Sequence, residues 1–300
     1  IRRGGLRAAL PAGPRLISGP GCPVCVTPGR EVEKAIRLAC EPGVLLFCFP
    51  DMLRVPGACG SLETARATRG ARVRTIYSPI EALEFAAGEP GRKAVIFGVG
   101  FETTIPIFAS VLRRARERGI RNLFLLPAFK LLPPGLAALL SRPGIGVDGL
   151  ILPGNVTAVI GADAYRFIAA RHRLPGVVAG FETSDILRAV LMLLEMIADG
   201  EPRILNEYTR FSDDRGNAAA LAAVREVFAP RDSVWRGLGT VPGSGLGLNE
   251  AYAAFDAGTL LDGEVPPVPD PPGCICGDVI VGAREPEECT LFGGRCTPSR

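Results

Sequence analysis

Cysteines carry most of the chemistry that this sequence could perform, and the most closely framed pair is Cys22 and Cys25. Pro23 and Val24 separate the two thiols, and the preceding Gly19-Pro20-Gly21 predicts a turn that fixes their spacing. A Cys-x-x-Cys pair serves either as a dithiol/disulfide couple or as two thiolate ligands of a soft metal such as Fe(II), Cu(I) or Zn(II). The spacing alone leaves both uses open.

A second group of cysteines lies near the C-terminus, at Cys274, Cys276, Cys289 and Cys296. This tail is rich in turn residues and poor in periodicity, so a metal or an iron-sulfur cluster would have to order it. Structural zinc sites use two Cys-x-x-Cys knuckles, whereas the gaps here are one, twelve and six residues. The spacing therefore favours an iron-sulfur cluster over zinc.

Asp51 and Arg54 follow the apolar run that ends at Phe49. A carboxylate and a guanidinium at the end of a strand could shape a site or tune the pKa of a nearby thiol, and a surface ion pair is the alternative. Cys48 lies within the apolar run and is expected to be an inert buried thiol. Cys40 and Cys59 are likewise expected to have no chemical role.

The tetrapeptide Gly100-Phe101-Glu102-Thr103 recurs as Gly180-Phe181-Glu182-Thr183. Each copy follows a strand-like run and precedes a helical pattern, so its loop could cap the helix and direct backbone N–H groups at a polar ligand. An acidic first turn with no ligand is the alternative. The repetition favours a functional role and predicts two related halves.

Charge and composition exclude several classes of function. The net charge of +3 comes from 34 basic and 31 acidic residues without a run of one sign, which argues against nucleic acid or an anionic membrane as partner. No apolar run approaches the roughly 18 to 20 residues that span a bilayer. The single histidine, His172, nearly excludes histidine triads and multi-histidine metal sites. Closely spaced thiols in a chain of this length are typical of a reducing cytoplasm.

The chain alternates short apolar runs with amphipathic helical stretches up to about residue 228, which predicts βαβ units and parallel sheets covered on both faces. The single tryptophan, Trp235, is expected to be a packing anchor. We predict two Rossmann-like α/β domains, at 13–118 and 119–230, and an irregular cysteine-rich region at 231–300 that includes a proline-rich linker at 262–273. The expected strands are 15–18, 44–49, 73–77, 94–99, 122–126, 147–152 and 176–179, and the expected helices are 31–40, 79–87, 104–118, 133–140, 157–171 and 184–198.

Taken together, several motifs resemble the HypD family of hydrogenase maturation factors, in family order along nearly the whole chain. They are Gly19-Pro20-Gly21-Cys22-Pro23-Val24-Cys25, Pro50-Asp51-Met52-Leu53-Arg54-Val55-Pro56, Gly100-Phe101-Glu102-Thr103-Thr104, Val178-Ala179-Gly180-Phe181-Glu182, Trp235-Arg236-Gly237-Leu238-Gly239, and the tail from Cys276-Gly277-Asp278 to Cys296-Thr297-Pro298.

The resemblance implies a scaffold, rather than a conventional turnover enzyme, on which the Fe(CN)2CO unit of [NiFe]-hydrogenase is assembled. It implies a HypC-type chaperone and a HypE-type cyanide donor as partners, with Cys22, Cys25, Asp51 and Arg54 as the reactive residues. It also implies that Phe101, Glu102, Thr103, Asn155 and Glu182 shape the site. A [4Fe-4S] cluster held by the tail cysteines would support electron transfer to the paired thiols.

The sequence departs from the family pattern at four places. Asn155 and Phe129 stand where the family has histidines, and neither side chain can transfer a proton or bind a metal as imidazole does. The family's Cys-Gly-Gly-His motif would precede Ile1, and its fourth cluster cysteine would follow Arg300. We therefore expect the natural protein to extend beyond both ends.

Two other functions fit the residues. One is a general dithiol-disulfide oxidoreductase with a structural zinc tail, which would contain zinc instead of iron. The other is a divergent family member that retains only the binding of the HypC-type partner.

Overall fold

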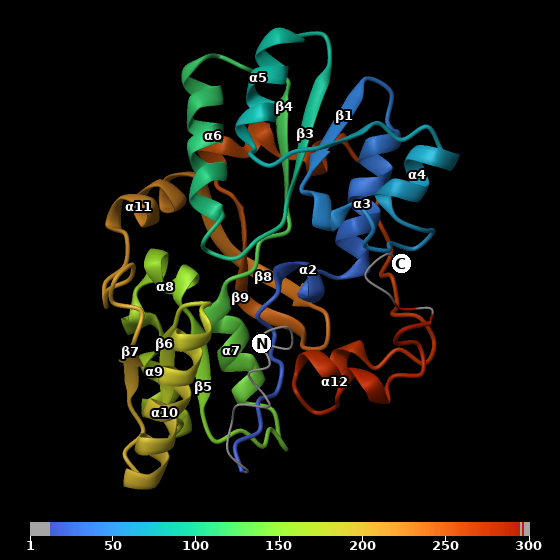
Figure 1. Ribbon diagram of the computed structural model, residues 1–300. Helices are drawn as coiled ribbons and strands as arrows, with labels where there is room; N and C mark the ends of the chain where they lie inside the picture. The colour runs from blue at the N-terminus through green and yellow to red at the C-terminus, as the bar shows by residue number, and fades with distance from the viewer. Residues whose placement is uncertain (1–12, 295, 297–300) are drawn as a thin grey trace.

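A computed structural model describes residues 13–294 and residue 296. The fold is α/β, with two parallel sheets, a long antiparallel hairpin between them and a cysteine-rich C-terminal segment (Figure 1). The predicted fold class is therefore confirmed.

The first sheet has the strand order β2-β1-β3-β4, and every neighbouring pair is parallel. Its side chains alternate between two cores: Leu45 and Phe47 enter one, whereas Leu46 and Cys48 enter the other. Helices α5 and α6 cover the first core, and α3 and α4 cover the second. The elements are α3 (Gly29–Cys40), β1 (Val44–Cys48), α4 (Leu62–Thr68), β2 (Val73–Thr75), α5 (Ile80–Gly88), β3 (Lys93–Gly98), α6 (Ile105–Glu117) and β4 (Leu123–Pro127).

The second sheet has the order β5-β6-β7 and is also parallel. Val177 packs under α10 on one face, while Val178 joins a larger core on the other, so this sheet is also covered on both sides. The elements are α7 (Leu132–Leu140), β5 (Leu150–Pro153), α8 (Gly154–Ile160), α9 (Arg166–His172), β6 (Gly176–Ala179), α10 (Thr183–Asp199) and β7 (Ile204–Asn206).

Two predicted elements are wrong. Residues 15–18 form no strand; prolines and glycines flank the segment on both sides, and these residues interrupt strand pairing. The predicted helix at 157–171 is broken at Gly161, whose φ of +80° is a left-handed conformation that ends α8. A short 3₁₀ turn, η2 (Ala162–Tyr165), then leads into α9.

A hairpin absent from the predicted elements links the two sheets. Helix α11 (Ala218–Val227) leads into β8 (Phe228–Trp235), which pairs with β9 (Gly239–Leu248) in antiparallel register. Phe228 and Leu246 enter the first sheet's core beside Phe129, so the chain returns from the second sheet to the first. Strand β4 belongs to the first sheet although it follows residue 118, and the domain boundaries themselves stay a prediction.

The C-terminal segment is held against helix α3. The Arg30 Nε–H donates to the Val265 carbonyl at 2.6 Å, and the Arg30 guanidinium pairs with Glu264 at 2.7 Å. The proline-rich linker therefore lies fixed on the first domain's surface. The remaining elements are η3 (Glu250–Phe255), η4 (Ala257–Leu260), α12 (Cys276–Ile280) and η5 (Pro286–Glu288). Across the described residues, no helix combines the length and apolar character needed to cross a membrane.

Candidate thiol site

The paired cysteines lie on a single helical turn near the middle of the molecule, α2 (Pro23–Val26) (Figure 1). Cys22 is the N-cap of this turn, and its Sγ accepts a hydrogen bond from the Cys25 backbone N–H at 3.3 Å. Pro23 occupies the first helical position, where its missing N–H leaves no donor unpaired. Cys22 is half-buried and Cys25 is exposed, so both sulfur atoms lie at the surface of one turn.

The two thiols differ in acidity. Hydrogen bonding from the Cys25 thiol, together with backbone N–H groups, lowers the pKa of Cys22 to about 6 against the opposing effect of burial. The same thiol–thiolate hydrogen bond, burial and the negative charge of Cys22 raise the pKa of Cys25. Near neutral pH, Cys22 is therefore the thiolate and Cys25 is the thiol that donates to it.

Trp235 anchors this turn to the hairpin. Its indole is 1% exposed, stacks on Phe101 with ring centroids 5.9 Å apart, and donates its Nε1–H to Ser244 Oγ at 2.8 Å. The next residue, Arg236, donates its backbone N–H to the Val26 carbonyl at 2.9 Å. The expectation that Trp235 packs in the interior is confirmed, and its role is to fix the end of β8 beside the paired thiols.

Helix α12 brings a tail cysteine to the same place. Gly237 has a φ of +84°, and a Cβ there would lie 2.8 Å from the Gly277 carbonyl oxygen, so the two backbones approach closely. The charge of Cys276 raises the pKa of Cys25, and that of Arg236 lowers it. Arg236 also forms an ion pair with Asp270 at 3.1 Å. A thiol pair, a third thiol and one guanidinium are thus gathered around the end of β8.

The other tail cysteines lie around α12. The Cys276 N–H donates to Cys274 Sγ at 3.4 Å, and burial raises the pKa of Cys276, with Cys274 and Cys296 adding to the effect. Backbone N–H groups, first that of Ile275, lower the pKa of Cys289. Among the described residues, no three His, Cys, Asp or Glu side chains form a group that could hold a metal ion.

Asp51 and Arg54 have separate partners. Asp51 is exposed on η1 (Pro50–Met52), and its charge is close enough to oppose the ionisation of Cys22. Arg54 forms an ion pair with Glu63 at 3.2 Å, with each side chain about half exposed. Cys48 is fully buried, and burial raises its pKa to about 12, as expected of an inert thiol.

The two copies of the repeated tetrapeptide occupy equivalent strand ends in different environments. Phe101 is 6% exposed and packs on Trp235, whereas Phe181 is 70% exposed. Glu102 is buried, whereas Glu182 is exposed at the N-cap of α10. Thr103 is exposed in the turn before α6. The first copy therefore lies in the molecular interior beside the thiol site, and the second faces outward.

Glu102 caps a helix of the other half of the molecule. Its Oε1 accepts the Leu132 N–H at 2.8 Å, at the first residue of α7. The next two residues, Pro133 and Pro134, have no N–H, so Glu102 pairs with the one donor that this helix start presents. Burial raises the pKa of Glu102 to about 7, although hydrogen bonding from its own backbone N–H and from the Leu132 N–H opposes the rise.

We predict that this carboxyl makes the stability of the protein pH-dependent. A pKa of about 7 in the folded state against 4.5 for the ordinary group means that the folded protein binds the proton more tightly. The stabilisation is fully present below about pH 4.5 and is lost as the pH rises through 7, by about 3 kcal/mol in total. Urea unfolding of Glu102→Gln should lack this pH-dependent component. An identical slope in both proteins between pH 5 and 7 would contradict the prediction.

The two positions that lack the family's histidine have different surroundings. Asn155 is exposed in the first turn of α8. Phe129 is buried between Phe108 and Phe228, with ring centroids 4.9 and 5.5 Å away. Phe129 is therefore a core residue, whereas Asn155 can present its amide at the surface.

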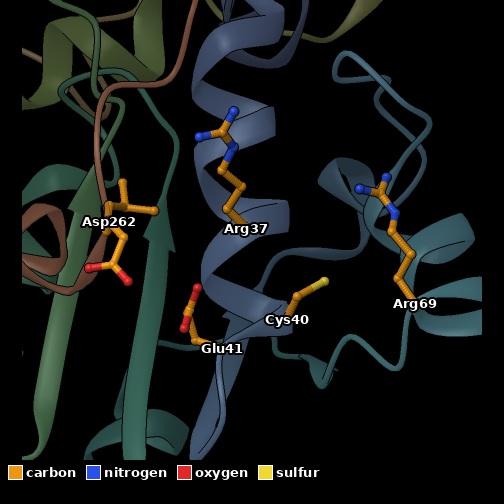
Figure 2. Close-up of a pocket in the computed structure, with 6 residues that line it drawn as sticks. Arg37, Cys40, Glu41, Arg69 and Asp262 are labelled. Carbon is orange, nitrogen blue, oxygen red and sulfur yellow. The ribbon is translucent and has the colours of Figure 1, made fainter.

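A separate cavity of about 270 Å³ lies at the C-terminal end of α3. Figure 2 shows Arg37 and Cys40 on this helix and Glu41 directly after its end, with Arg69 and Asp262 on the other sides of the cavity. The positive charges of Arg37 and Arg69 balance the negative charges of Glu41 and Asp262 around Cys40. This cavity is not part of the thiol site.

The protein-family model described as "HypD: Hydrogenase formation hypA family" matches residues 1–300. The chain belongs to the HypD family. The "Hydrogenase maturation factor HypD" of Escherichia coli (strain K12) is 43% identical over 295 residues, covering 98% of this chain and 79% of the relative. The protein of the same name from Rhodobacter capsulatus is 43% identical over 303 residues, with 99% and 80% covered. That from Rhizobium leguminosarum bv. viciae is 42% identical over 305 residues, with 99% and 79% covered.

For this HypD family member, the motif resemblance is confirmed, but the individual contacts of Arg236, beside the thiols, and of Lys130, against strand β8, were not predicted. Arg236 was noted only within a motif, and its proximity to Cys25 and Cys276 becomes visible only in the fold. Lys130 is 1% exposed and donates from Nζ to Ser233 Oγ at 2.5 Å and to the Val234 carbonyl at 2.9 Å. The sequence signal for Lys130 was its place in Phe129-Lys130-Leu131, which corresponds to a His-Lys/Arg-Leu segment of the family.

Proposed function

We propose that this protein is a cytoplasmic hydrogenase maturation factor and serves as the scaffold on which an Fe(CN)2CO unit is assembled, together with a HypC-type chaperone and a HypE-type cyanide donor. Family membership and the names of the relatives support the maturation role. The observation that carries the scaffold role is the placement of Cys22 and Cys25, with opposite pKa shifts, beside Arg236 and Cys276.

In this proposal the paired thiols bind the iron that is the cargo of the scaffold. The Cys22 thiolate is ready to bind, and Cys25 gives up its proton when it becomes a second ligand. Thiolates are soft donors that suit Fe(II) carrying CO and cyanide. The positive charge of Arg236 stabilises the added negative charge of the second thiolate. Asp51 acts in the opposite direction and limits the ionisation of Cys22.

The tail cysteines are the proposed ligands of a [4Fe-4S] cluster. Their chemistry fits that group, because cysteine thiolates are its usual ligands and N–H groups aimed at the sulfur, as at Cys289, tune such clusters. Cys274, Cys276, Cys289 and Cys296 would hold it, and when bound it would supply or accept electrons. Cys276 is the tail thiol whose charge affects the pKa of Cys25. Electrons would therefore pass between the cluster and the paired thiols on the side of Cys276.

The test is anaerobic co-expression of the full-length protein with HypC-type and HypE-type partners. We expect bound iron, acid-labile sulfide and infrared bands in the CO and cyanide stretching region. Cys22→Ser and Cys25→Ser should remove most of the infrared intensity and keep the sulfide, because they alter only the cargo ligands. Cys276→Ser should lower the sulfide content severalfold.

Cys59→Ser is the matched control, since Cys59 is an exposed thiol in another loop. It should leave iron, sulfide and infrared bands unchanged. Zinc in place of iron, with thiol-disulfide turnover on unrelated proteins, would overturn the proposal in favour of a general oxidoreductase. Complex formation with the HypC-type partner but without any iron unit would overturn the scaffold role.

A further inference from the structure

A second cavity, of about 240 Å³, lies between the two halves of the molecule. It is partly open to solvent, and its lining residues lie at the beginnings of α6 and α7, at the end of α8, on helix α11 and on strand β9. Its wall is mostly apolar and includes Leu131, Ile160, Leu221 and Leu246. The cavity reaches the surface at Arg225, whose side chain is exposed.

One wall of this cavity carries the buried carboxyl group of Glu102, and only one of its two oxygens accepts a hydrogen bond from another described residue. Glu102 is 7% exposed, and its Oε1 is used by the Leu132 N–H. Its Oε2 is buried and has no hydrogen-bond partner within the described part of the chain. Buried polar atoms in folded proteins are nearly always paired, so an acceptor on a cavity wall is suited to a donor from a bound molecule.

A buried hydroxyl lies in the electrostatic range of the same carboxyl. Tyr165 is fully buried, with its hydroxyl close to that of Thr157. Burial, followed by the charge of Glu102, raises the pKa of Tyr165. A hydrogen bond with the Thr157 hydroxyl, which itself donates to the Pro153 carbonyl at 2.9 Å, opposes this rise. Neither Tyr165 nor Thr157 lines the cavity, so Glu102 is the buried polar group of its wall, and the other lining residues are apolar except for Arg225 at the opening.

We propose that this cavity binds a small, mostly apolar organic molecule with one N–H or O–H group, which donates a hydrogen bond to Glu102 Oε2. The volume of about 240 Å³ is below the ~300 Å³ at which sites for drug-sized ligands begin, so the ligand is small. An apolar wall with few placed polar groups is the usual composition of such sites. No cysteine lines this cavity, so the proposed ligand would not contact the paired thiols.

The test is a ¹⁹F NMR titration of the full-length protein with two probes. 4-Fluorophenol carries the required O–H, and 4-fluorotoluene has nearly the same size with a methyl group in its place. We expect saturable binding of 4-fluorophenol that is at least tenfold tighter than binding of 4-fluorotoluene, because only the phenol pairs with the carboxyl. No saturable binding of 4-fluorophenol, or equal affinity for the two probes, would overturn the proposal.

Three variants locate the binding. Leu221→Trp should fill the cavity from α11 and abolish binding of 4-fluorophenol, whereas Ala222→Trp, on the exposed side of the same helix, should leave it unchanged. Glu102→Gln keeps an oxygen for the Leu132 N–H and should remove the preference for the phenol. Circular dichroism confirms that each variant is folded. Unchanged binding in folded Leu221→Trp, or an unchanged preference in folded Glu102→Gln, would refute the assignment.

Discussion

At pH 6, iodoacetamide should alkylate Cys22 in the folded protein about tenfold faster than the same cysteine in the urea-unfolded chain. With a pKa of about 6, half of Cys22 is thiolate at this pH. An ordinary cysteine with a pKa of about 8.5 is then only ~0.3% thiolate. The lower basicity of Cys22 makes each thiolate a weaker nucleophile by roughly a factor of ten, which leaves a net advantage of about tenfold.

The dependence of the alkylation rate on pH shows in which direction the pKa of Cys22 is shifted. The alkylation rate of Cys22 should rise through a midpoint near pH 6 and level off above pH 7, where the thiol is fully ionised. Peptide mass spectrometry after brief labelling measures the rate at each pH. A midpoint above pH 8 would show that the turn does not stabilise the thiolate.

Cys25→Ala provides the matched variant. It removes the thiol hydrogen bond that contributes most to the acidity of Cys22 and keeps the backbone N–H bonds. The midpoint should therefore move upward and the rate at pH 6 should fall severalfold. An unchanged midpoint would show that the backbone N–H groups alone lower the pKa of Cys22.

Replacing Trp235 by alanine should destabilise the protein by about 3 to 5 kcal/mol, the usual cost of removing a large buried aromatic side chain. The indole is 1% exposed, stacks on Phe101 and hydrogen-bonds Ser244, so all three contributions are lost together. It also fills the space over Gly135 in α7, where a Cβ would lie 2.5 Å from the ring.

Urea unfolding followed by far-ultraviolet circular dichroism measures the loss without relying on tryptophan fluorescence. Trp235→Phe should cost less than the alanine variant, because it retains a ring against Phe101 but loses the Ser244 hydrogen bond. Val234→Ala is the control at the neighbouring, 45% exposed position, and it should change stability by about 0.5 kcal/mol or less. A loss below about 1 kcal/mol for Trp235→Ala would refute its role as the anchor.

The sequence by itself determined the alternation of strands and helices, because each buried strand and amphipathic helix leaves a local pattern of apolar residues. Val44–Cys48 and Lys93–Gly98 were recognisable in this way. The hairpin was not, because most side chains of β8 are exposed and β9 contains four glycines in ten residues, which hide the two-residue alternation.

The tertiary structure alone decided how the candidate residues meet. Two identical tetrapeptides gave the same sequence signal, yet Glu102 is buried against α7 and Glu182 is exposed, because the hairpin and α7 cover only the first copy. In the same way, Cys276 lies beside Cys25 because Gly237 and Gly277 let two distant backbones touch. Contacts between residues more than two hundred positions apart depend on how the elements pack, and no local pattern of residues encodes them.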